Sequence, residues 1–226
     1  MPANLLRIEL RADHALSGPL DLKRVHLFDA DGREIVGAFL GLALPDRDGR
    51  NVDVLMHPGR IKTGVGPNLA LGPALHAGQR VTLRIDDPQL GPPMMRHWIV
   101  TGDLRQRVDL AGWTLQTPAA GTRKPLIVGF VAPMSRRART MIAVADEHGV
   151  RIHGLVELSG DELQWRFVPT RPWSAGRYVL RVHPDLEDVA GNRVCARFEQ
   201  AALHGVVCNA DGRRPFSIAN AAPGRG

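Results

Sequence analysis

Apolar and polar side chains alternate along much of this chain, most clearly between residues 163 and 182. Apolar side chains occupy every second position in two runs: Leu163, Trp165 and Phe167, followed by Tyr178, Leu180 and Val182. A period of two places such a set on one face of a sheet and leaves intervening arginines, such as Arg166 and Arg177, in water. Pro169, Pro172 and Gly176 interrupt the pattern between the runs. The stretch therefore predicts two antiparallel strands of a β-sandwich.

A similar order of predicted strands occurs twice in the sequence. Four segments match in order: 6–10 with 126–130, 26–37 with 142–154, 52–58 with 163–169, and 77–85 with 175–182. Ordered self-similarity is typical of a duplicated structural unit. We therefore predict an all-β protein of two tandem Ig-like antiparallel β-sandwiches. The first would span residues 1–105 and the second residues 106–202, and a C-terminal tail, 203–226, can contribute one added strand.

The two copies differ at an insertion in the first one, residues 59–72. Because the second copy closes without this segment, the insertion is free to carry a function. Arg60 and Lys62 stand among glycines and Asn68 follows, so backbone N–H groups and two cations could hold an anion or another ligand. The spacing is not that of a P-loop, because Val65 occupies the position of its lysine. The alternative interpretation is a structural flap packed by its own aliphatic side chains.

Composition and charge support an all-β protein that does not bind nucleic acid. The 17 prolines and 24 glycines separate short alternating runs, and helical periodicity is nearly absent, with at most a turn or two expected within residues 135–145. The formal net charge is +6, and nearly all of the positive charge is arginine at scattered positions. No aromatic residues are interleaved with the densest clusters, 135–139 and 213–214, so a platform for stacking bases is missing.

Sequence signatures of catalysis and of metal binding are absent. No nucleophile elbow or zinc-protease motif occurs, the five serines lack a nucleophile context, and the nine histidines form no ligand set. Two turns could bind calcium, residues 46–53 and the trio Asp185, Asp188 and Asn192, but carboxylates that hydrogen-bond their own turns explain them as well. Cys195 and Cys208 could form a disulfide or stay as thiols. We predict no enzyme, no cofactor and no metal site.

Four segments of the second half carry a family resemblance: residues 165–169, 172–173, 175–178 and 188–192. Together they resemble the SbsA-type bacterial Ig-like domain, which occurs in S-layer and other exported proteins. The whole chain is similar to uncharacterised bacterial proteins with two tandem Ig-like domains, on residues 2–6, 57–64 and 214–216. That group usually has an acidic residue where His57 stands, and further sequence with an export signal before the counterpart of Pro2. The resemblance implies an exported protein whose first domain lacks an edge strand, and an open edge invites pairing with another chain.

These observations favour a non-catalytic structural or binding protein of the bacterial cell envelope or exterior, in a periplasmic or extracellular location. The first alternative is an anion- or carbohydrate-binding protein that uses Arg60, Lys62 and Asn68 together with a groove between the domains. The second alternative is a pair of accessory domains of a larger enzyme system. We expect another protein or a cell-surface glycan as partner. The sequence as printed contains no apolar run of transmembrane length and no signal peptide.

Overall fold

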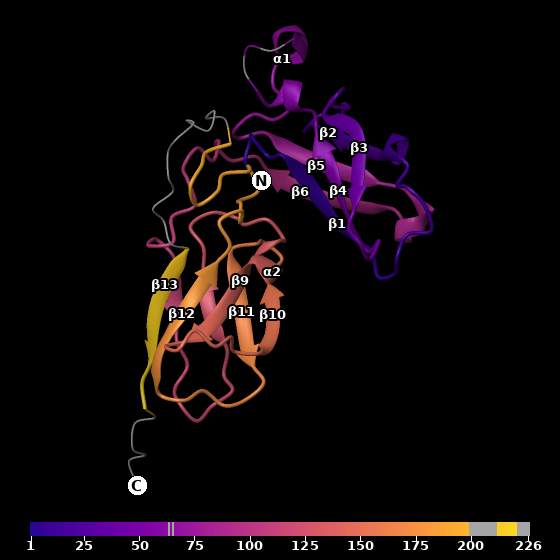
Figure 1. Ribbon diagram of the computed structural model, residues 1–226. Coiled ribbons are helices and arrows are strands. Elements are labelled where there is room, and N and C mark those ends of the chain that lie inside the picture. The colour runs from indigo at the N-terminus through magenta and orange to yellow at the C-terminus, as the bar shows by residue number, and fades with distance from the viewer. Residues whose placement is uncertain (63, 65, 199–211, 221–226) are drawn as a thin grey trace. The chain divides into compact units, whose positions relative to one another are not determined.

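The computed structural model describes residues 1–62, 64, 66–198 and 212–220 (Figure 1). The chain divides into two compact units, Met1–Leu104 and Arg105–Gly226. Within the described residues, antiparallel strands make up most of the regular structure of both units. Each unit contains two sheets that share a core.

The first unit is a sandwich of two three-stranded sheets, with strand orders β1-β4-β3 and β2-β5-β6. Its strands are β1 (Arg7–Arg11), β2 (Val25–Phe28), β3 (Phe39–Pro45), β4 (Asn51–Met56), β5 (Arg80–Ile85) and β6 (Met94–Ile99). Alternate side chains of the two central strands are buried: Val52, Val54 and Met56 in β4, and Val81, Leu83 and Ile85 in β5. The period of two in the sequence thus gives each sheet one apolar face, and the two apolar faces form the core.

The second unit is a sandwich of a four-stranded sheet, β10-β11-β8-β7, and a three-stranded sheet, β13-β12-β9. Its strands are β7 (Thr114–Gln116), β8 (Leu126–Gly129), β9 (Ile142–Asp146), β10 (Gly154–Leu158), β11 (Gln164–Pro169), β12 (Gly176–Val182) and β13 (Arg213–Ile218). Both sheets contribute to a single buried cluster, for example Val128 and Trp165 from the first sheet and Val144 and Leu180 from the second. The strand β13 comes from the C-terminal segment and pairs with β12.

The strand order is the same in the two units. The sheet β1-β4-β3 corresponds to β8-β11-β10, and β2-β5-β6 corresponds to β9-β12-β13. The matched sequence segments lie at corresponding places in these sheets. The predicted all-β fold of two tandem Ig-like sandwiches is confirmed. The units differ at one edge: β7 lies beside β8, whereas β1 pairs only with β4 among the described strands.

Aromatic side chains fill much of the core of the second unit. Trp173 and Tyr178 meet edge to face, with ring centroids 5.4 Å apart, and Tyr178 stacks on Phe216 at 5.5 Å. The Tyr178 hydroxyl donates a hydrogen bond to the Ser174 carbonyl oxygen, 3.0 Å away. A tyrosine that bonds backbone a few residues upstream is the tyrosine corner of Ig-like sandwiches. It fixes the turn that leads into β12.

The helices are short and lie in connections between strands. They are α1 (Gly66–Leu71), α2 (Ala138–Met141) and the 3₁₀ turns η1 (Leu22–Arg24), η2 (Pro58–Arg60) and η3 (Pro88–Leu90). The helical turn expected within residues 135–145 is α2, and the rest of that segment belongs to β9. Among the described residues, no helix has the length and apolar character needed to cross a membrane. Cys195 is disulfide-bonded, and Cys208 lies outside the described residues.

Candidate functional site

The outward face of the β9-β12-β13 sheet carries several exposed arginines. In β12 the core-facing side chains are Tyr178, Leu180 and Val182. Because side chains alternate between the faces of a sheet, Arg177, Val179 and Arg181 lie on the outward face. The pattern that predicted the strand from its apolar positions therefore also determines which polar positions share a surface.

Cross-strand pairing extends this surface to both sides of β12. Val179 lies between Ala145 of β9 and Pro215 of β13 in the register of the sheet. An isolated bridge pairs Ala145 with Arg151, which brings an exposed arginine to the far side of this apolar row. We call the surface the cationic shelf. It comprises the apolar residues Val179 and Pro215 and the arginines Arg151, Arg177, Arg181 and Arg213, whereas Ala145 itself is buried.

Two arginines of the cationic shelf lie directly opposite each other. Arg181 of β12 pairs in register with Arg213 of β13, and both side chains are exposed. Like charges at directly opposite positions destabilise a pair of strands. Within the described part of the chain, Arg181 makes no ion pair or side-chain hydrogen bond.

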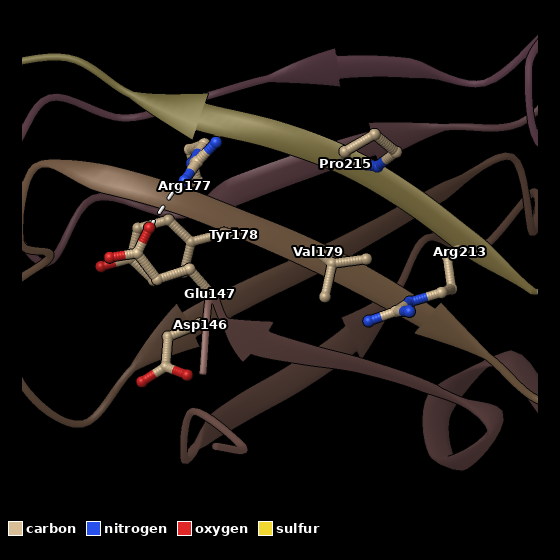
Figure 2. Close-up of a pocket in the computed structure, with 7 residues that line it drawn as sticks. All are labelled: Asp146, Glu147, Arg177, Tyr178, Val179, Arg213 and Pro215. Carbon is tan, nitrogen blue, oxygen red and sulfur yellow. Dashed lines mark hydrogen bonds and ion pairs between the residues drawn. The ribbon is translucent and has the colours of Figure 1, made fainter. Parts of the chain in front are cut away.

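The cationic shelf contains an open hollow of about 310 Å³. Figure 2 shows Val179 and Pro215 near its middle, with Arg213 toward one end and Arg177 and Glu147 toward the other. The Arg177 Nε atom is 3.4 Å from Oε2 of Glu147. Both side chains are largely exposed, so this ion pair contributes little to stability and can open to accommodate a ligand. The volume is at the low end of the range for small-ligand sites.

A second carboxylate at the Glu147 end is held in place by its own turn. Oδ1 of Asp146 accepts hydrogen bonds from the backbone N–H groups of His148 and Val150, at 3.0 and 2.9 Å. The other oxygen of Asp146 is not used by these two bonds. The hollow therefore has cationic groups at both ends and carboxylate acceptors at one end only.

The corresponding face of the first unit has similar residues but a different balance of charge. Arg80, Thr82 and Arg84 of β5 occupy the positions of Arg177, Val179 and Arg181 in the matched segments. Arg84 lies 3.3 Å from a carboxylate oxygen of Asp86. The residues opposite Arg80, Thr82 and Arg84 on β6 are Ile99, His97 and Met95. No pair of arginines faces each other in the β5–β6 register, unlike Arg181 and Arg213 in the second unit.

The structure places Arg60, the first candidate of the insertion, inside its own loop. The side chain is 6% exposed. Its Nε donates a hydrogen bond to the Gly72 carbonyl at 2.7 Å, and its two terminal nitrogens donate to the carbonyls of Val36 and Pro73. The guanidinium group thus joins both ends of the insertion to the preceding β2–β3 connection. Three of the five N–H donors of Arg60 are used by backbone carbonyls, which favours a structural role, and Arg60 as a ligand-binding residue remains a prediction.

The other two candidates of the insertion are placed differently. Lys62 is exposed, and its backbone N–H donates to the Pro58 carbonyl at 2.9 Å. The Asn68 side-chain nitrogen is buried, without a hydrogen-bond partner among the described residues. An added Cβ at Gly59 would lie 2.8 Å from Pro67, so the insertion packs closely on itself. These contacts favour the structural-flap interpretation, and a ligand site on this loop remains a prediction.

The two acidic turns considered for calcium use their carboxylates to hold the backbone. Asp188 Oδ1 accepts from the N–H groups of Ala190 and Asn192, both at 2.9 Å. Burial raises the pKa of the Asp188 carboxyl above its ordinary value. In the other turn, a hydrogen bond from the Asn51 side chain lowers the pKa of Asp46. No group of three or more His, Cys, Asp or Glu side chains suited to a metal ion occurs among the described residues.

Comparisons with known proteins give structural similarities only. No protein-family profile matches the chain, and curated protein sequences give no significant match. A chimeric titin Z1Z2 functionalised with a KLER peptide from decorin has a TM-score of 0.26 and 9% identity, over 97% of this chain and 98% of its own. The titin domains Z1Z2 in complex with telethonin give 0.23 and 12%, over 70% and 73%. Rst D1-D2 gives 0.25 and 9%, over 95% and 90%. These TM-scores are low, and the Ig-like architecture follows from the sheets of this chain itself.

The cationic shelf was not among the sites predicted from the sequence. The sequence shows arginines at alternate positions of the matched segments 77–85 and 175–182. We interpreted them as ordinary solvent-facing side chains. The decisive feature is the pairing of Arg181 with Arg213, which depends on a strand contributed from the C-terminal segment. One sequence signal could have indicated this strand. Polar and apolar residues alternate around Pro215, and the basic cluster 213–214 stands at the start of that run.

Proposed function

We propose that this protein is a non-catalytic binding protein of the bacterial cell envelope or exterior, and that the cationic shelf of its second Ig-like unit binds an anionic partner. The observation that carries the proposal is the row of exposed arginines, Arg177, Arg181 and Arg213, on one outward sheet face beside Val179 and Pro215. Because the arginines lie on an open sheet face, they are accessible to an anionic polymer or to an anionic surface of another protein.

The polar groups of the described residues outside the cationic shelf have structural roles. The buried polar groups described above hold turns or join the insertion to the fold. Neither sandwich brings a nucleophile and a base together in the contacts that are described. The SbsA-type resemblance supports an exported location, where cell-surface polymers and other envelope proteins carry many anionic groups. The alternative of accessory domains in a larger enzyme system is compatible with the same binding surface.

The proposal is tested by binding of the purified full chain to immobilised polyanions and to neutral polymers of similar length, at physiological ionic strength. We expect retention on at least one polyanion, and loss of retention for the double variant Arg181→Gln, Arg213→Gln. The matched control is Arg80→Gln combined with Arg84→Gln, which removes the same charge from the corresponding face of the first unit. Equal binding by the two double variants, or no binding to any polyanion, would overturn the proposal.

A further inference from the structure

We infer that the chain forms a weak two-fold dimer, in which β6 of one copy pairs antiparallel with β6 of a second copy and joins their β2-β5-β6 sheets. Among the described strands, β6 (Met94–Ile99) pairs with β5 alone, so its other side is a sheet edge. An edge strand presents backbone N–H and C=O groups to which a strand of another chain can bind. This inference concerns the first unit and does not depend on the cationic shelf.

The direction of the backbone groups along β6 follows from the hydrogen bonds at its end. The Val100 N–H donates to the Gln79 carbonyl at 2.8 Å, and hydrogen-bonded positions alternate along an antiparallel pair. The even-numbered residues of β6 therefore bond to β5. The odd-numbered residues direct their N–H and C=O groups to the edge: Met95, His97 and Ile99. The Met1 amino group agrees with this assignment, because it donates to the Ile99 carbonyl from the edge side, at 3.3 Å.

Two other edge strands carry features that oppose pairing with another chain. Pro45 of β3 and Pro215 of β13 stand at positions whose backbone nitrogen points to the free edge, and proline has no N–H to donate there. The register of β3 is also irregular between Phe39 and Ala43. By contrast, β6 keeps an unbroken register with β5 and contains no proline. It can therefore accept a strand along its length.

The two ends of β6 select one register for a second copy. Pro93 precedes the strand and lacks an edge donor. Beyond the other end, residues 1–3 already occupy the edge, where the Ala3 N–H donates to the Thr101 carbonyl at 3.1 Å. A second copy is thus limited to positions 95, 97 and 99. A two-fold axis at His97 uses all three, because His97 then faces its own counterpart and positions 95 and 99 face each other.

The side chains of β6 complement one another in this register. Met95 and Ile99 are 56% and 63% exposed, and each lies against the other residue of the second copy, as an apolar cross-strand pair. On the opposite face of the strand, Arg96 lies across from Trp98 of the second copy, and a guanidinium group can stack on an indole ring. An inward-pointing charge on an edge strand normally opposes pairing. Here the second copy supplies an aromatic partner for it.

The inference is tested by sedimentation analysis of the full chain over a range of concentrations. One pair of strands buries less surface than a permanent interface does, so we expect a reversible dimer with a Kd on the order of 10–100 μM. Met95→Glu and Ile99→Lys should each weaken it by about fivefold or more. The double variant should restore dimerisation, because each glutamate then faces a lysine of the second copy. A chain that stays monomeric at every concentration, or a double variant no better than the single ones, would overturn the inference.

A cysteine at the two-fold axis tests the register directly. Opposite residues of a hydrogen-bonded antiparallel pair have Cα atoms about 5.5 Å apart, a separation that suits a disulfide. Under mild oxidation, His97→Cys should give a covalent dimer on a non-reducing gel. Met95→Cys is the matched control and should give none, because position 95 faces position 99. Equal cross-linking of the two variants, or none in either, would contradict a two-fold axis at His97. Circular dichroism of each variant confirms that it is folded.

Discussion

Arg181 and Arg213 face each other across β12 and β13, on the outward side of the second sandwich. The corresponding position opposite Arg84 in the first unit is occupied by Met95. One copy of the duplicated sheet has thus acquired a like-charge pair that the other copy lacks. Residues that serve function often lower the stability of a natural protein. Substitutions at this pair can measure such a cost in the free energy of unfolding.

Replacing one member of the pair with an acidic residue should stabilise the second unit. In Arg181→Glu, a repulsion becomes an attraction, and we expect a gain of about 0.5–1 kcal/mol in the free energy of unfolding. Urea unfolding at low and high salt measures it, because the gain should shrink as salt screens the charges. Arg80→Glu is the control: it lies opposite Ile99 and should give no such gain. A loss of stability in Arg181→Glu at low salt would contradict the repulsion.

The tyrosine corner should contribute measurably to the second unit. Tyr178→Phe removes the hydrogen bond to the Ser174 carbonyl but keeps the ring that stacks on Phe216. We expect a loss of about 1 kcal/mol in the free energy of unfolding, the usual net value of one such bond. Ser174→Ala retains the accepting carbonyl and should leave stability unchanged. If the two variants lose stability equally, the hydroxyl bond is not the cause.

The guanidinium group of Arg60 should stabilise the packing of the insertion, residues 59–72, on the first unit. Arg60→Ala leaves the carbonyls of Gly72, Val36 and Pro73 without this donor, and we expect a loss of about 2–4 kcal/mol. Lysine cannot reproduce the fork of donors, so Arg60→Lys should restore only part of the stability. The exposed Arg80→Ala serves as control in the same urea experiment. An Arg60→Ala chain as stable as the wild type would show that the insertion does not depend on this residue.

The sequence was sufficient to predict the strands of the four matched segments and their duplication, because a period of two and the Asp/Gly turns are local signals. It did not indicate β3 or β6, which lie outside those segments. It also indicated the core positions of β11 and β12, which are buried as expected. The role of Arg60 was not predictable, because it depends on the Val36 carbonyl, which lies 24 residues earlier in the chain. In the sequence, Arg60 and Lys62 stand among glycines, which suggested an anion site, whereas in the structure Arg60 is buried and bonded to backbone carbonyls. The cationic shelf likewise depends on the register between β12 and β13, which alternation alone does not determine.

The buried turn around Asp188 should make stability depend on pH in a direction unusual for an aspartate. Burial raises the pKa of this carboxyl above its ordinary 3.8, so the folded chain keeps the proton to a higher pH than the unfolded chain does. Its contribution to the free energy of unfolding is therefore fully present below pH 3.8 and is lost as the pH rises through the raised pKa. Asp188→Asn retains one oxygen for the N–H groups of Ala190 and Asn192 and does not titrate. Urea unfolding of both proteins across the acidic range should show the wild type losing stability relative to Asp188→Asn as the pH increases. A relative gain over that range would mean that the hydrogen bonds to the carboxylate outweigh its burial.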